Sequence, residues 1–243
     1  MNNISKAARL MLFLLSLLVA APAAGNAATQ TYPPYQPGQI VPAHAVKAVG
    51  KSRFFTCTTV PDSVFRQMKG KTYKNNCTVA VGQLRYLRCL HKDRRGNSIV
   101  GEMVLNVKIA QRVLQIFRQL YDAGYPIERM RLMDCWDADD ERAMRDNNSS
   151  GFNFRFVSHT RKVSKHGLGL AVDINTLYNP YCKRLKNGTE VVEPATGKPY
   201  LDRSKAFDYK IEKGDLCYRL FVAAGFRWGG NWTKSKDYQH FEY

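Results

Sequence analysis

The chain has 243 residues, of which 44% are hydrophobic and 12% aromatic, with 17 glycines and 10 prolines. This composition excludes a disordered or fibrous protein and fits one folded domain with a sizeable core. The formal charge of +17 favours contact with polyanions such as wall polymers, lipid headgroups or nucleic acid.

The first 27 residues predict a secretory signal peptide. Lys6 and Arg9 precede an apolar run from Leu10 to Ala21, and small residues follow it. We expect cleavage after Ala23 or Ala27, which would remove two positive charges and leave +15 of the original +17. The mature protein would then be exported to the periplasm, the cell wall or the medium; an uncleaved anchoring helix is the alternative. No later stretch has the about 20 apolar residues of a membrane span, so we expect none after signal removal.

The next segments predict a linker and then a hairpin. Residues 28–52 contain four prolines and indicate an extended linker or a segment wrapped on the domain. Asp62 is a candidate cap for a short helix through Met68. Alternating residues then predict a strand over 79–90, a charged turn, and a second strand over 98–105.

Two core helices and one more strand follow. Asn106 can cap a helix whose apolar residues recur at three- and four-residue steps until Gly124. Residues 127–135 are typical of a strand. Residues 215–224 predict a second helix, with Leu216, Leu220 and Phe221 facing inward. The pattern indicates one α+β domain over residues 53–243, expected to be a monomer.

Six cysteines in an exported chain suggest disulfides. None forms a CxxC pair, so a zinc site built from thiolates is disfavoured. We expect Cys182 to pair with Cys217, which would close the insertion between them. Buried free thiols are the alternative for Cys89 and Cys135.

The basic residues are scattered rather than aligned on one helix. They form either a solvated surface or a surface that attracts anionic wall polymers. No recognisable DNA- or RNA-binding motif is present, so we expect no nucleic-acid partner.

Two of the five histidines lie in short segments that also contain aspartates. The segment SKHGLGLAVDIN spans residues 164–175, and DYQHFEY spans residues 237–243. A catalytic zinc site needs three imidazole or carboxylate ligands and one open position, which His166, Asp173 and His240 can supply. In a continuous strand His166 and Asp173 would point apart, because seven residues is an odd step. His166 must therefore lie in a turn before the strand, where Gly167 permits a bend.

A zinc hydrolase also needs a base that is not itself a ligand. Asp237, in the predicted turn before His240, is the preferred candidate. Glu242 is the rival, although it could instead orient the imidazole of His240. We assign His44 and His91 to structural roles, and His159 at most to the edge of the site.

These motifs resemble those of the M15 metallopeptidases, the D-alanyl-D-alanine carboxypeptidase family, in which S-x-H-x-x-G-x-A-x-D and D-x-x-H-F-E carry the zinc site. Further blocks resemble the branch that contains L-alanyl-D-glutamate endopeptidases. These blocks are NNSSGFNFR (147–155), NPY (179–181), YLDR (200–203) and GFRWGGNW (225–232).

The resemblance implies a hedgehog/DD-peptidase-like fold, with a small antiparallel sheet flanked by helices. It implies Zn²⁺ as the cofactor, with His166, Asp173 and His240 as ligands. It also implies Asp237 as general base and Arg155 as the residue that steadies substrate and oxyanion. Trp228 and Trp232 would line the site or simply join the core.

The implied activity is hydrolysis of peptide bonds in peptidoglycan, at D-Ala-D-Ala or at L-Ala-D-Glu, with peptidoglycan peptides as the substrate. The alternative is a non-catalytic wall-binding module of the same fold that keeps zinc for structure. The sequence leaves the cleaved bond open.

Overall fold

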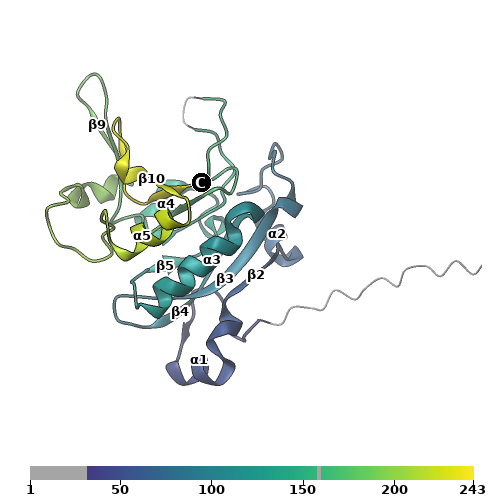
Figure 1. The fold of residues 1–243 in the computed structure, drawn as a ribbon. Helices are drawn as coiled ribbons and strands as arrows, with labels where there is room; N and C mark the ends of the chain where they lie inside the picture. The colour runs from purple at the N-terminus through teal and green to yellow at the C-terminus, as the bar shows by residue number, and fades with distance from the viewer. Residues whose placement is uncertain (1–31, 158–159) are drawn as a thin grey trace, which may run out of the picture. The chain divides into compact units, whose positions relative to one another are not determined.

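The structure, a computed structural model, describes residues 32–157 and 160–243 (Figure 1). These residues form short helices and small, mostly antiparallel sheets, in agreement with the predicted α+β class. The predicted signal peptide and His159 lie outside the described residues. None of the helices in the described ranges is long and apolar enough to cross a membrane.

The largest sheet has four antiparallel strands in the order β1-β4-β3-β2. The strands are β1 (Ile40–Val41), β2 (Thr56–Thr59), β3 (Leu84–Lys92) and β4 (Ser98–Asn106). Leu87 packs in a core shared with helix α3 (Val107–Asp122), whereas Tyr86 belongs to a second apolar cluster. Figure 1 shows α3 lying along β3. Burial on both faces explains why successive residues of β4, from Met103 to Leu105, are all apolar and buried.

The predicted hairpin is confirmed, but its first strand begins later in the sequence than predicted. Residues 81–83 form a 3-10 turn, and β3 begins only at Leu84. Asp93 holds the turn, because its Oδ1 accepts hydrogen bonds from the backbone amides of Arg95 and Asn97, each at 2.9 Å. Such an Asx turn is a local signal that the charged loop already contained.

Both predicted core helices are present. In α3 the side chain of Asn106 accepts from the amide of Lys108 at 3.1 Å, which confirms the cap. In α5 (Leu216–Ala223) Asp215 caps the helix by accepting from the amide of Tyr218 at 2.7 Å. Phe221 is fully buried, whereas Leu216 and Leu220 are only partly buried.

Helix α2 (Asp62–Met68) has the predicted bounds, but its cap differs. Pro61 occupies the capping position, and no side chain caps the helix. Asp62 instead lies in the first turn, where its charge favours the positive end of the helix dipole.

The strand predicted over residues 127–135 is wrong for most of its length. Only β5 (Arg129–Met130) is extended, and a 3-10 helix occupies Met133–Trp136. The cause is a distant contact, since the buried Asp134 accepts hydrogen bonds from the hydroxyl and amide of Thr72 at 2.8 and 3.3 Å. A local pattern could not reveal that partner.

Residues 32–52 lie on the domain rather than forming an extended linker. Strand β1 pairs with β4, and helix α1 (Ala43–Val49) buries Ala45. Of the two predicted alternatives for this segment, the described part therefore fits the wrapped one.

All six cysteines are free thiols in the structure, so the expected Cys182–Cys217 pair is not formed. Cys217 is buried in the core beside Tyr125, while Cys182 lies half-buried in strand β8. Cys89 is a buried free thiol, which is the alternative to a disulfide for this residue. Cys135, for which the same alternative applies, is a free thiol but is exposed.

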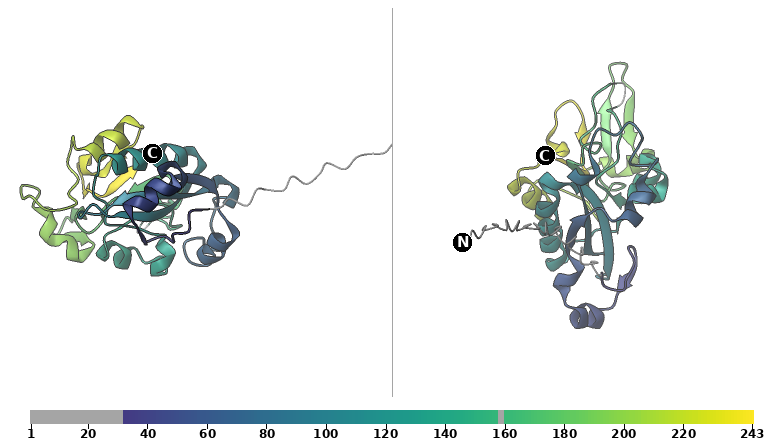
Figure 2. Two further views of the ribbon diagram at one scale, coloured as in Figure 1. Left: turned by 90° about the horizontal axis from the view of Figure 1, so that it is seen from below. Right: turned by 90° about the vertical axis from the view of Figure 1, so that its right-hand side faces the viewer.

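Two three-stranded antiparallel sheets carry the remaining motifs. One has the order β10-β12-β7, and the other has the order β11-β8-β9. Their strands are β7 (Ala171–Asp173), β8 (Tyr181–Arg184), β9 (Glu190–Glu193), β10 (Arg227–Trp228), β11 (Lys236–Asp237) and β12 (His240–Glu242). Helix α4 (Asp140–Arg145) precedes β6 (Asn148–Ser149), which pairs in parallel with β5. Figure 2 shows β8 and β9 side by side as a hairpin.

Gly169 offers a test of how the turn before β7 is held. Its φ is +67°, and a Cβ there would lie 2.8 Å from the backbone nitrogen of Asn106. We expect Gly169→Ala to lower the free energy of unfolding by about 3 kcal/mol, since strain and overlap add. Gly188→Ala is the control, with φ +84° and open space, and should cost only about 1 kcal/mol. Urea denaturation measures both, and equal losses would contradict the role of the Asn106 contact.

Candidate functional site

The register between β7 and β12 brings two of the predicted site residues together. His240 lies directly opposite Asp173, and Phe241 lies opposite Val172. Because side chains alternate along a strand, the fully buried Val172 and Phe241 face the core while Asp173 and His240 face the other side. His240 Nδ1 lies 2.9 Å from Asp173 Oδ1.

His166 joins this pair from the turn before β7, as the sequence required. Its Nε2 lies 3.1 Å from Asp173 Oδ2 and 3.1 Å from His240 Nδ1. Gly169, rather than Gly167, has the positive φ that bends the chain. Gly167 is needed for a different reason, because a Cβ there would lie 2.8 Å from the carbonyl oxygen of Arg155.

The outer nitrogens of both imidazoles have partners. His166 Nδ1 lies 2.7 Å from the carbonyl oxygen of Gly151, so this nitrogen carries the proton and leaves Nε2 with a free lone pair. His240 Nε2 faces Glu242 Oε2 at 3.6 Å. Glu242 is in turn paired with Arg227 at 2.7 Å. Partners of this kind fix the tautomer of metal-binding histidines.

The cluster is buried and strongly polarised. The exposed fraction of the side chain is only 6% for His166, 14% for Asp173 and 9% for His240. Burial opposes ionisation of Asp173, but the two histidines hold the pKa of its carboxyl well below the usual range. Burial likewise opposes the charge on His240, yet hydrogen bonds to Asp173 and Glu242 raise the pKa of that imidazole.

The donor set fits a divalent metal ion. One ligand atom from each of His166, Asp173 and His240 can be chosen so that all three lie within 4.8 Å of one another. Two imidazole nitrogens and one carboxylate oxygen leave a fourth tetrahedral position open, which is the pattern of catalytic zinc sites.

Asp237 reaches the site from β11, not from a turn. It pairs with Tyr181 of β8, and its Oδ1 is buried with no hydrogen-bond partner among the described residues. Burial raises the pKa of the Asp237 carboxyl to about 7; His240 and His166 oppose this rise, and the charge of Asp173 adds to it. A buried, unpaired carboxylate beside a polar cluster is a candidate proton acceptor.

Arg155 is tied to the site through its backbone and through an acidic partner. Its carbonyl oxygen accepts from the amide of Ser164, at the start of the turn that carries His166. Its Nε forms an ion pair with Asp140 Oδ2 at 2.6 Å, although the N–H does not point along that contact. Asn153 donates to the other oxygen of Asp140 at 3.1 Å. The sequence placed Asp140 only in an acidic stretch and did not identify it as the partner of Arg155.

The two tryptophans of the GFRWGGNW block separate in role. Trp228 is buried and donates from Nε1 to the carbonyl oxygen of Tyr238 at 2.8 Å, so it belongs to the core. Trp232 lies beside the site, with its ring centroid 5.5 Å from that of His240.

The other histidines do not join the cluster. His91 is buried with Nδ1 2.7 Å from the carbonyl oxygen of Ile127, and burial lowers its pKa to about 4. His44 lies exposed on α1. Both observations agree with the structural roles predicted for them.

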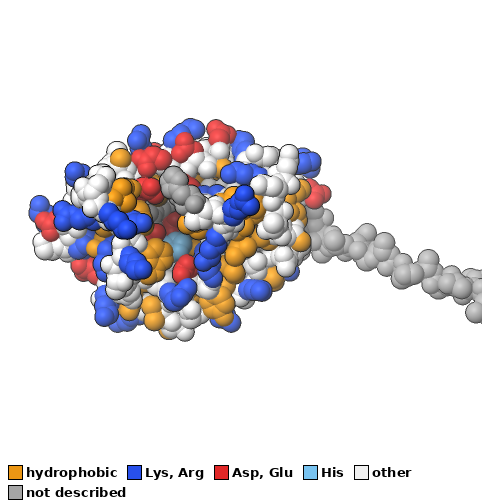
Figure 3. All heavy atoms as spheres, turned by 90° about the horizontal axis from the view of Figure 1, so that it is seen from above, with side chains coloured by type: hydrophobic (Ala, Val, Ile, Leu, Met, Phe, Trp, Pro, Cys, Tyr) orange, Lys and Arg blue, Asp and Glu red, His pale blue; other side chains and the backbone are white. Residues whose placement is uncertain are grey.

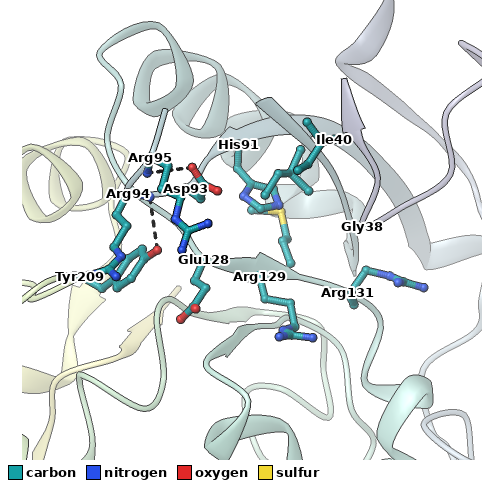
Figure 4. A pocket seen from close by; sticks show the side chains of 12 residues that line it. Gly38, Ile40, His91, Asp93, Arg94, Arg95, Glu128, Arg129, Arg131 and Tyr209 are labelled. Carbon is teal, nitrogen blue, oxygen red and sulfur yellow. Dashed lines mark hydrogen bonds between the residues drawn. The ribbon is translucent and has the colours of Figure 1, made fainter. Parts of the chain in front are cut away.

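A cavity of about 470 Å³ lies away from the cluster (Figure 4). Four arginines line it, but Asp93 and Glu128 also line it. Arg94 and Arg131 are moreover paired with Asp208 and Glu102. The positive charge of this cavity is therefore largely offset. A different face shows a hollow in which a histidine and carboxylates lie among lysine and arginine side chains (Figure 3).

Comparison with known proteins gives one match. Residues 158–243 match the family model of M15 peptidases described as D-alanyl-D-alanine carboxypeptidase. The matched segment contains all three cluster residues and Asp237. No curated protein and no solved structure matches the chain significantly. Over residues 158–243 the chain is therefore similar to the M15 family of peptidases.

Proposed function

We propose that the protein is an exported, zinc-dependent peptidase that hydrolyses peptide bonds of bacterial peptidoglycan. The main support is that the side chains of His166, Asp173 and His240 lie close together, within a segment that matches the M15 family model. Residues 1–27 would be its signal peptide, the mature chain a monomer, and its fold of the DD-peptidase type. The family match favours carboxypeptidase cleavage at D-Ala-D-Ala, and cleavage at L-Ala-D-Glu is the variant of the same chemistry.

The cofactor would be held by His166 Nε2, His240 Nδ1 and the carboxylate of Asp173. When bound, zinc would supply Lewis acidity to the scissile carbonyl and to the attacking water. The hydrogen bond from His166 to Gly151 and the contact of His240 with Glu242 would keep both rings oriented for this task.

Asp237 would act as the general base for the attacking water. Its unpaired Oδ1 has no competing hydrogen bond among the described residues, and a pKa near neutrality suits proton transfer in both directions. Glu242, the rival candidate, already contacts Arg227 and His240. Its geometry suits orientation of His240 rather than proton transfer.

Arg155 would bind the substrate carbonyl or carboxylate and stabilise the negative charge that develops on the oxyanion. Its Nε side lies against Asp140 in an ion pair, so the two terminal nitrogens of the fork would remain for the substrate. Asp140 would thereby set the direction in which the guanidinium points.

A non-catalytic module that keeps zinc for structure is the second candidate. Such a module does not require a buried carboxylate oxygen without a hydrogen-bond partner, such as Asp237 Oδ1. The position of Asp237 therefore favours the enzyme.

Metal content tests the ligand set. We expect one zinc ion per wild-type chain and loss of most of it in His166→Ala, because two ligands hold a metal poorly. His44→Ala removes an exposed histidine from α1 and serves as the matched control. Elemental analysis of dialysed protein measures both variants, and full zinc retention in His166→Ala would refute the ligand assignment.

Digestion of purified muropeptides tests the reaction itself. We expect the zinc-loaded wild type to release fragments whose masses identify the cleaved bond. Asp237→Asn should retain zinc but lose about 10²- to 10⁴-fold in rate, the usual contribution of a general base. If Glu242→Gln shows that behaviour and Asp237→Asn does not, the two roles are exchanged. Intact muropeptides after incubation with the wild type would leave the non-catalytic module as the better proposal.

Asp140→Asn tests how Arg155 is positioned. The change removes the charge that holds Arg155 Nε but preserves the shape of the side chain, so we expect kcat/KM to fall about tenfold. Asp208→Asn breaks the exposed Arg94 pair and should leave kcat/KM unchanged. Thermal unfolding of both variants separates misfolding from misplacement, and equal kcat/KM values would argue that Asp140 only stabilises α4.

A further inference from the structure

The sheet that carries Asp237 has two chemically distinct faces. Asp237 lies directly opposite Tyr181, and Tyr181 lies opposite Glu193 of β9. Residues opposite one another share a face, and so do alternate residues along a strand. Lys183, two residues beyond Tyr181, therefore lies on the face that carries Asp237, opposite Val191.

Tyr181 lies between two carboxylates of this face. Burial raises the pKa of its hydroxyl, Ser235 lowers it, and the charges of Glu193, Asp237 and Cys182 raise it further. Glu193 and Asp237 flank Tyr181 by register, one on each side of β8. The face that begins at Asp237 thus continues through Tyr181 toward Lys183.

Lys183 is a free cation on this face. It is exposed and forms no ion pair within residues 32–157 and 160–243. Glu193 shares the face but lies on the far side of β8 from Asp237, opposite Tyr181. Asp237, Tyr181 and Glu193 thus form one row across the sheet, and Lys183 lies diagonally from Asp237 in the next row of this face along β8.

The opposite face has a separate set of charges. Cys182, Arg184, Glu190 and Lys236 share it by register. They contribute to the lining of a shallow hollow of about 430 Å³ at the edge of the sheet, whose rim Lys183 also reaches. Arg184 is thus adjacent to Lys183 in sequence and equally exposed, but it points away from the Asp237 face.

We propose that the face formed by Tyr181 and Lys183 is a substrate subsite, in which Lys183 binds a carboxylate of the peptide on one side of the scissile bond. This inference rests on the proposed peptidase function and adds a preference for acidic over amidated peptides. Neither Tyr181 nor Lys183 has another role in the site described above.

The spacing fits an extended peptide. A strand rises about 3.3 Å per residue, so Lys183 lies about 7 Å along β8 from the residue opposite Asp237. A substrate that runs along β8 would place an acidic side chain within reach of Lys183 one to three residues from the bond attacked. The flexible stem of lysine lets its ammonium group meet a carboxylate in this range.

Paired peptides test the proposal. The probes are synthetic peptides ending in D-Ala-D-Ala, with glutamate or glutamine at each of the three positions before the scissile bond. At one of the three positions, we expect the glutamate peptide to have a kcat/KM about fivefold higher than the matching glutamine peptide. A difference of this size is what a partly exposed ion pair contributes. Lys183→Gln should abolish this preference, Lys183→Arg should preserve it, and Arg184→Gln should leave it intact because it lies on the other face.

Binding to the metal-free chain, measured by calorimetry, gives a second readout that does not depend on turnover. If no peptide is cleaved by the zinc-loaded wild type, the proposed function fails, while a binding preference that depends on Lys183 still supports the subsite. Equal loss of preference in Lys183→Gln and Arg184→Gln would assign the effect to general positive charge and overturn the subsite. A wild type without any preference for glutamate would overturn it as well.

Discussion

The pairing of β7 with β12 is the constraint on which the candidate site depends. It buries the carboxylate of Asp173, and an unpaired charge at that depth would cost several kcal/mol. His240, opposite in register, and His166, from the preceding turn, supply the compensating contacts. On the core side of the same strands, Phe241 stacks on Phe221 at 4.4 Å between ring centroids. Packing of α5 against β12 therefore fixes the register that creates the polar cluster.

Asn106 connects this cluster to the main sheet and its helix. It is the last residue of β4, and its side chain caps α3. Its backbone amide donates to the carbonyl oxygen of Gly169 at 2.8 Å, and its Nδ2 donates to that of Leu168 at 3.1 Å. One residue thus ends a strand, begins a helix and holds the turn that presents His166. The rigidity of the hydrophobic core is thereby transmitted to His166, a candidate metal ligand that lies outside any strand.

Local sequence patterns predicted what local forces determine. The caps Asn106 and Asp215, the apolar period of α3, and the turn position of His166 all follow from residues close in sequence. The failures depend on distant partners. Thr72 binds Asp134 and breaks the strand predicted over residues 127–135. The pairing of Asp237 with β8, and of Arg155 with Asp140, likewise joins segments that no periodicity relates.

The surroundings of Asp173 and Asp237 suit these two carboxylates to different proposed tasks. Asp173 contacts both histidines, which keep it ionised and suited to hold a cation. Asp237 lacks a hydrogen-bond partner at Oδ1 among the described residues, and burial raises its pKa to about 7. A cation bound at the cluster would favour the ionised form of Asp237 and lower that pKa, because unlike charges attract. Asp237 would then be ready to accept a proton at neutral pH, whereas Asp173 would remain a ligand. Two aspartates in one site thus acquire different chemistry from their contacts, as expected when environments separate pKa values.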